Sequence, residues 1–237
     1  QSDIQLQAAT AIALEGLNPE TTEIILADGT VTDVVNNPNV AITHLDNKPV
    51  TFEAATKLAI DGRIDPAEWP LETKIVNDPN DSQWTSSNEI DALHMCWDET
   101  YLYLAIDGQV SSNSWILYLD TDWNGPNGQT NLTAIDTWER GATFTGTGFK
   151  PDFEWGTYQH QGGSDSSTLW KILSATTTED RTSLAVIAFD SQHTFGAQSG
   201  SEIAIPWDAL YGLGNNACPP STRIGVVASI CWDPDPA

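Results

Sequence analysis

From about residue 58 onward, the chain is a series of short runs rich in Val, Ile, Thr, Tyr and Trp, separated by loops of Gly, Asn, Asp, Ser and Pro. YLYLAIDG, SWILYLDTD and IGVVASICW are three such runs. Residues of the first kind favour strands and those of the second favour turns. No window of helical period reaches twelve residues, and IPWDALYG (205–212) predicts only one helical turn. The pattern predicts an all-β fold, an antiparallel β-sandwich.

A clean alternation precedes this region in residues 1–14, QSDIQLQAATAIAL. Period two predicts one extended strand, about 40 Å long at ~3.3 Å per residue. Most strands have only five or six residues, so this one would be unusually long. One face carries Asp3, Gln5, Gln7 and small alanines. The other face, interrupted by Thr10, carries Ile4, Leu6, Ala8, Ile12 and Leu14.

We therefore divide the chain into an extended N-terminal strand or arm (1–15), a β-hairpin segment (16–57) and a sandwich domain (58–237). The middle segment holds two predicted hairpins, TEIILADGTVTDVV, which turns at Asp28-Gly29, and VAITHLDNKPVTF (40–52). Two alternatives stay open for residues 1–57: they pair with their own sandwich, or they form a small β domain of their own.

The charge balance excludes some partners. The chain has 33 acidic and nine basic residues, a formal net charge of −24 and a pI of about 4.1. Such a polyanion does not bind nucleic acid or anionic lipid through its net field, but it attracts divalent cations. The plainer interpretation of the acidity is solubility on a secreted or salt-exposed surface. The sequence contains no run of ~18 apolar residues, so it predicts no membrane span.

Further features favour an extracellular or cell-surface location. The sequence opens with Gln1 rather than Met, as expected of a processed, exported protein. Two sequons make Asn80 and Asn131 candidate glycosylation sites. Three cysteines, without C-x-x-C spacing, leave open one disulfide with a free thiol or three buried thiols.

Six strings in order carry a resemblance: IDGRIDPAEW (60–69), CWDETYLYLAIDG (96–108), WILYLDTDWNG (115–125), PDFEW (151–155), EIAIPWDAL (202–210) and IGVVASICWDPDP (224–236). Together they resemble the family 9 carbohydrate-binding modules and their DOMON-like relatives over about residues 58–237. The resemblance implies a sandwich of two antiparallel sheets. Relatives bind sugars, bind haem or serve as accessory domains of secreted glycan-active enzymes, so the fold does not settle function.

The sugar clamp of that family is not matched. Sugar-binding members hold the ligand between two tryptophans, one of them in the loop after the Y-L-Y strand. Here that loop reads GQVSSNS, and the next tryptophan, Trp115, lies inside a predicted strand. The second clamp tryptophan follows the closing strand, beyond Ala237. The clamp cannot be transferred to these residues.

The stretch LDTDWNGPNGQTNL (119–132) predicts a calcium site. Asp120, Asp122 and Asn124 stand two apart, and Gly125 permits the tight turn that brings their oxygens together. An EF-hand would place Glu where Asn131 stands, so Asn127, Asp136 or a distant acid must complete the shell. The alternative is a solvated acidic loop. Asn131 cannot be both beside the ion and glycosylated.

A second acidic cluster, Asp61, Asp65 and Glu68, is interpreted as capping a turn around Pro66, with ion binding as the alternative.

Ten tryptophans are many for this length. Four, Trp69, Trp97, Trp115 and Trp207, are predicted core residues. The tryptophans nearer loops can stack on sugar rings, with partial burial as the alternative. The candidate carbohydrate-binding residues are Trp123, Asp152, Glu154 and Trp155.

Catalysis has little support in the sequence. There is no G-x-S-x-G, H-E-x-x-H or Gly-rich phosphate loop, and none of the four histidines has a spaced partner. We expect a non-catalytic, secreted, calcium-stabilised structural subunit of an extracellular filament or surface assembly. Its partners would be copies of itself, which accept the N-terminal strand along a sheet edge. The alternative is a carbohydrate-binding module that binds extracellular glycans.

Overall fold

The computed structural model of the chain describes residues 12–14, 29–32, 58–78, 88–111, 113–123, 125–138, 142–146, 148–159, 166–189, 200–219 and 222–232.

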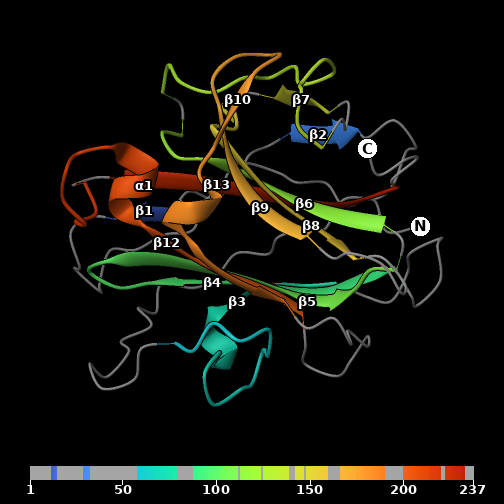
Figure 1. Cartoon of the computed structure of the whole chain (residues 1–237), viewed down its shortest axis with the longest axis vertical. Helices are drawn as coiled ribbons and strands as arrows, with labels where there is room; N and C mark the ends of the chain where they lie inside the picture. The colour runs from blue at the N-terminus through green and yellow to red at the C-terminus, as the bar shows by residue number, and fades with distance from the viewer. Residues whose placement is uncertain are drawn as a thin grey trace.

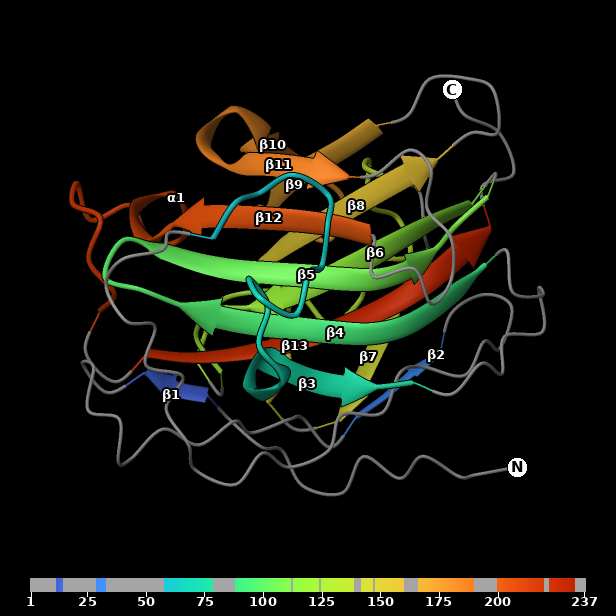
Figure 2. The same cartoon turned by 90° about the horizontal axis from the view of Figure 1, so that it is seen from below.

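The predicted all-β sandwich is confirmed. Two antiparallel sheets lie face to face (Figures 1 and 2). The first has six strands in the order β1 (Ile12–Leu14), β13 (Thr222–Trp232), β6 (Asn113–Asp120), β8 (Phe153–Gln159), β9 (Ser166–Ile172) and β10 (Thr178–Asp180). The second has five in the order β11 (Val186–Phe189), β12 (Gly200–Pro206), β5 (Tyr101–Gln109), β4 (Glu89–Trp97) and β3 (Lys74–Asn77).

The remaining elements are short. A two-stranded ribbon joins β2 (Gly29–Thr32) to β7 (Thr143–Gly146). The 3₁₀ helices are η1 (Leu71–Thr73) and η2 (Thr182–Leu184). The helical turn predicted near residue 207 is α1 (Trp207–Tyr211), which ends at Gly212 in the left-handed conformation. Within the described ranges, no helix has the length and apolar character needed to cross a membrane.

Apolar side chains from both sheets fill the space between them. Leu117 and Leu119 of β6 meet side chains of β5 and β12, such as Leu104 and Ile203, and all four are at most 1% exposed. Trp69, Trp115 and Trp207 are buried as predicted, whereas Trp97 is only partly buried. The three cysteines are free thiols, two buried and Cys218 partly exposed, which answers the open question of their pairing.

A third layer covers the outer face of the six-stranded sheet. Ile116 and Tyr118 point away from the inter-sheet core and pack with Phe144 of β7 and with Phe149. The rings of Tyr118 and Phe144 meet edge to face with centroids 4.9 Å apart. The segment between β6 and β8, which carries the predicted calcium loop, therefore folds back over its own sheet (Figure 1).

One strand of a predicted hairpin has a partner that the sequence did not predict. The second run of TEIILADGTVTDVV forms β2, but its partner is β7, with Thr30 opposite Thr145. The first run and the hairpin predicted for 40–52 lie outside the described residues. More than a hundred residues separate β2 from β7, so no local turn signal could indicate this pairing.

The predicted arm contributes the edge strand β1. Ile12 lies opposite Ile224, and Leu14 lies opposite Thr222, both of β13 in the same chain. Ile4, Leu6 and Ala8 lie outside the described residues. At its described end, then, the arm follows the alternative in which residues 1–57 pair with their own sandwich.

A buried carboxylate fastens the segment before η1 to the five-stranded sheet. Glu202 of β12 has no exposed surface. Its Oε2 accepts hydrogen bonds from the backbone N–H groups of Asp61 (2.8 Å) and Gly62 (2.5 Å). Its Oε1 accepts one from Trp69 Nε1 at 2.5 Å. Asp65 Oδ1 accepts from Ala67 N at 2.8 Å, so the predicted turn-capping role of that acid is confirmed.

Replacing Glu202 by Ala should lower the free energy of unfolding by roughly 2–4 kcal/mol, because two backbone donors and one indole donor lose their acceptor in a buried site. The matched control is Glu179→Ala, which removes an exposed ion pair with Arg181 and should cost about 0.5 kcal/mol or less. Urea denaturation of both variants measures the difference. Equal costs would contradict the anchoring role.

Candidate metal centre

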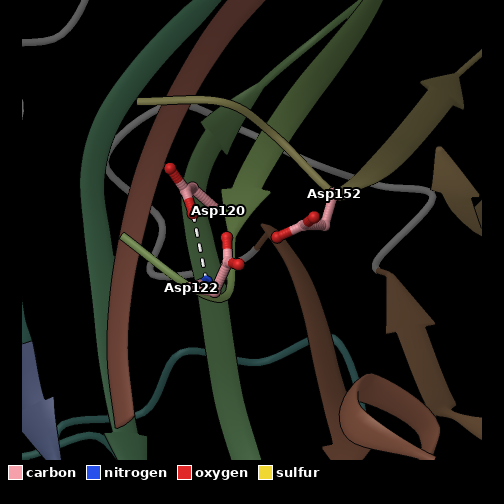
Figure 3. Close-up of side chains that lie close together, drawn as sticks. All are labelled: Asp120, Asp122 and Asp152. Carbon is pink, nitrogen blue, oxygen red and sulfur yellow. Dashed lines mark hydrogen bonds between the residues drawn. The ribbon is translucent and has the colours of Figure 1, made fainter. Parts of the chain in front are cut away.

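Three carboxylates meet where β6 ends (Figure 3). Asp120 is the last residue of β6, Asp122 lies in the turn that follows, and Asp152 immediately precedes β8. One carboxylate oxygen of each lies within 4.8 Å of the others. The backbone N–H of Asp152 donates to Leu119 O at 2.6 Å, which holds the start of β8 beside the end of β6.

The loop owes its shape to these acids. Asp120 Oδ1 accepts from Asp122 N at 3.1 Å, the bond drawn in Figure 3, and its Oδ2 accepts from Lys150 N at 2.7 Å. Asp152 Oδ2 accepts from both the N–H and the hydroxyl of Thr121 at 2.8 Å. The side chains thus bind the first and last residues of the long β6–β8 connection to each other.

Asp122 has an unused oxygen. Its Oδ2 accepts from Asn127 N at 3.2 Å and Asn127 Nδ2 at 2.5 Å. Its Oδ1 is buried and has no hydrogen-bond partner among the described residues. A Cβ at Gly125 would overlap this carboxylate, so the predicted need for glycine there is met in the structure.

The site concentrates negative charge with little compensation. Burial raises the pKa of Asp120 to about 7, and the Asp152 and Asp122 carboxylates add to the rise. Burial likewise raises the pKa of Asp152. The Lys150 ammonium donates to Gly125 O at 2.8 Å. In the described ranges, none of the three carboxylates forms an ion pair with a lysine or arginine.

These features fit a hard divalent cation. Calcium binds carboxylate and carbonyl oxygens at about 2.3–2.6 Å, so ligands on opposite sides of one ion lie about 5 Å apart. The separations within 4.8 Å are compatible with one shared ion. The buried orphan oxygen of Asp122 is the atom whose desolvation such an ion would offset.

The predicted calcium ligands are only partly brought together. Asp120 and Asp122 are in the group, and Asn127 touches it through Asp122. Asn124 lies outside the described residues. Asp136 is not in the group, and its Oδ1 accepts from the Thr137 hydroxyl (3.2 Å) and the Thr178 hydroxyl (3.0 Å).

The distant acid that the sequence left unassigned corresponds to Asp152. It stands 30 residues beyond Asp122 in the sequence and comes close because β6 pairs with β8. Its only sequence signal was its position just before a predicted strand.

The predicted carbohydrate-binding residues are all buried. Trp123 is 5% exposed, Asp152 6%, Glu154 1% and Trp155 0%. Trp123 packs against Phe149, with ring centroids 6.0 Å apart. Trp155 lies in the inter-sheet core, and its Nε1 donates to Ser167 Oγ at 2.9 Å. Neither ring offers an exposed face to a sugar, because Trp155 is covered in the core between the sheets and Trp123 is covered in the layer over the six-stranded sheet.

Glu154 is a second unusual acid of this region. Its Oε1 is buried and has no hydrogen-bond partner in the described part of the chain. Burial, with the nearby charge of Asp136, raises the pKa of Glu154 to about 8. The carboxyl therefore holds a proton at neutral pH.

The sequon at Asn131 is compatible with the carboxylate group. Asn131 is exposed, and its Oδ1 accepts from Thr133 N (3.0 Å) and the Thr133 hydroxyl (2.7 Å). It is not a member of the carboxylate group, so the predicted conflict between glycosylation and ion binding does not arise. Asn80 lies outside the described residues.

Comparison with protein-family models found no match to this chain, and a search of curated proteins also found none. The resemblance to family 9 carbohydrate-binding modules therefore stays a prediction.

Without divalent cations, the protein should be more stable near pH 5 than at pH 8. The pKa values of Asp120 and Glu202 (about 7) and of Glu154 (about 8) are raised in the folded state. The folded chain therefore binds more protons than the unfolded chain between about pH 4 and 8, and stability falls as pH rises.

Thermal melts in EDTA from pH 4.5 to 8.5 at fixed ionic strength measure this slope. Protonation at low pH also reduces the repulsion among the many acidic residues, which stabilises the folded protein in the same direction. The variant Glu154→Gln distinguishes the two effects, because it removes one raised pKa and should make the melting temperature depend less on pH. A melting temperature that rises steadily with pH would contradict the prediction.

Proposed function

We propose that this protein is a non-catalytic, calcium-stabilised structural subunit of an extracellular filament or surface assembly, and that neighbouring copies exchange the strand β1. The observation that carries the proposal is the position of β1. It forms the edge of the six-stranded sheet and, among the described strands, pairs only with β13.

Such a strand can be supplied by another copy. β1 ends at Leu14 and β2 begins at Gly29, so residues 15–28, fourteen residues, connect them. Fully extended, a connection of that length reaches roughly 46 Å at about 3.3 Å per residue. This reach allows the pairing that β1 makes within its own chain to be made with β13 of a neighbour.

The geometry of such an exchange favours a filament. The donated strand and the accepting edge are different surfaces of the subunit, so each copy has one of each to offer. A contact of this head-to-tail kind continues from copy to copy unless its rotation closes a ring.

The charge distribution is compatible with this contact. The formal net charge of −24 makes whole subunits repel one another. Residues 1–14 contain one charged side chain, Asp3. The exchanged segment would therefore bring little of the repulsion into the interface.

Calcium has a structural role in this proposal. The three carboxylates accept backbone hydrogen bonds from their own loop, at Asp122 N, Lys150 N and Thr121 N among others. An ion there would hold the β6–β8 connection against the sheet, and it would be bound constantly where calcium is plentiful outside cells. Glycan binding is the alternative, and it depends on the resemblance alone, because the predicted sugar-binding residues are buried.

Calcium should raise the melting temperature at pH 8 by roughly 5–10 °C when its concentration is about 100 times the dissociation constant, and EDTA should reverse the rise. Asp120→Asn should abolish the response and raise the melting temperature in EDTA, because it removes one buried charge. Asp136→Asn is the matched control outside the group and should keep the response. A melt unchanged by EDTA in the native protein would remove the site.

Deleting residues 1–14 should give a folded protein that no longer polymerises. Ala13→Pro should act in the same way, because proline interrupts the pairing of Ala13 with Arg223, and Ala13→Ser is its control. Circular dichroism reports folding, and electron microscopy with light scattering reports assembly. Polymers of unchanged form from the truncated protein would refute the exchange.

A further inference from the structure

Lys150 brings a positive charge to the group of three carboxylates. Its backbone N–H donates to Asp120 Oδ2 at 2.7 Å, and its side-chain ammonium donates to Gly125 O at 2.8 Å. The residue therefore joins the end of β6 to the turn that follows Asp122. Among the described residues of the β6–β8 connection, Lys150 is the only basic one.

The loop is built closely around Lys150. Gly128 lies directly against the Lys150 carbonyl, and a Cβ at Gly128 would overlap that carbonyl. Beside it, Gln129 N donates to Pro151 O at 3.1 Å. These backbone contacts place the start of the Lys150 side chain, and the side chain then reaches back to the carbonyl of Gly125.

The ammonium lies near the carboxylates without pairing with any of them. Gly125 is packed against the Asp122 carboxylate, because a Cβ on it would overlap Asp122 Oδ2. The ammonium on Gly125 O is therefore close enough to act on this carboxylate through space. In the described part of the chain it forms no ion pair with the three acids, and Asp122 Oδ1 keeps no hydrogen-bond partner.

We infer that Lys150 is an internal counter-ion of this loop and that it lowers the affinity of the carboxylate group for a divalent cation. The inference rests on the calcium site of the proposed function. A bound dication and a nearby ammonium repel each other in a half-buried site, so ion binding would draw the ammonium away from Gly125 O. Weak binding of this kind suits extracellular calcium modules, whose dissociation constants are about 10⁻⁴–10⁻³ M.

This role and a purely structural role predict opposite effects. If the ammonium served only to shape the turn, its removal would loosen the turn and weaken ion binding. If it is a counter-ion, its removal strengthens ion binding, because the repulsion disappears. The turn keeps other bonds without it, since Asp120 Oδ1 accepts from Asp122 N and Asp122 Oδ2 accepts from Asn127 Nδ2.

Lys150→Met tests the sign, because it removes the ammonium and keeps most of the aliphatic chain and the backbone N–H. It should lower the dissociation constant for calcium about tenfold. In EDTA it should lower the melting temperature by about 2–4 °C, because one charge-assisted hydrogen bond is lost. Lys150→Arg keeps the charge and should bind calcium as the native protein does. Isothermal titration calorimetry with calcium chloride gives the constants, and unchanged or weaker binding by Lys150→Met would overturn the inference.

A measurement on the native protein does not depend on the folding of a variant. Acetylation of lysine amines by an N-hydroxysuccinimide ester, followed by mass spectrometry of the peptides, reports how accessible each amine is. Calcium should raise the acetylation rate of Lys150 by about threefold or more over the rate in EDTA, because the amine gives up its hydrogen bond. Lys74, in β3 of the other sheet, is the internal control and should not change. A Lys150 rate that calcium leaves unchanged or lowers would also overturn the inference.

The calorimetry separates this inference from the proposed function. Calcium binding by the native protein with tighter binding by Lys150→Met supports both. Calcium binding by the native protein without tighter binding by Lys150→Met refutes the role of Lys150 and leaves the calcium site. Binding by Lys150→Met alone supports the role of Lys150 and refutes constant occupancy of the native site. Absence of binding by both proteins refutes both the calcium site and the role of Lys150.

Discussion

All eight residues of β6 are buried, and the rest of the structure depends on covering both of its faces. A strand of an antiparallel sandwich usually has one face in solvent, but NSWILYLD has apolar side chains on both sides. The second sheet covers one face through Leu117 and Leu119. The segment that leaves β6 must return to cover the other, and Phe144 and Phe149 of that segment do so.

This return creates the need for buried acids. A chain that leaves a sheet strand and folds over it loses sheet partners for its backbone, and buried N–H groups require acceptors. Asp120 and Asp152 accept from N–H groups at both ends of the returning segment, and Glu202 does the same for the segment before η1. Some of the acidic residues of this chain are therefore buried, where they serve as hydrogen-bond acceptors. Where several such acids converge, as around Asp122, the fold gains backbone order and accumulates charge that a cation can neutralise.

Local patterns in the sequence predicted what depends on neighbouring residues. β5, β6 and β13 follow runs of β-branched and aromatic residues, and α1 follows IPWDALYG. The spacing of Asp120 and Asp122 likewise indicated half of the carboxylate group. Pairings between strands that are far apart in the sequence could not be predicted from local patterns. Asp152 joins the group through the pairing of β6 with β8, and β2 finds β7 across the sequence. Trp155 was assigned to a ligand surface, whereas it is buried in the core between the two sheets, whose strands come from distant parts of the sequence.

The position of β13 has a consequence for the order of folding. β13 lies between β1 and β6, so strands from the first and last parts of the sequence meet in one sheet. Contacts of such large sequence separation carry a high loop-closure cost and make folding slow. During synthesis, β1 and β6 leave the ribosome long before β13 exists. The six-stranded sheet therefore closes only after β13 has been made, and until then its apolar strands need protection from other chains.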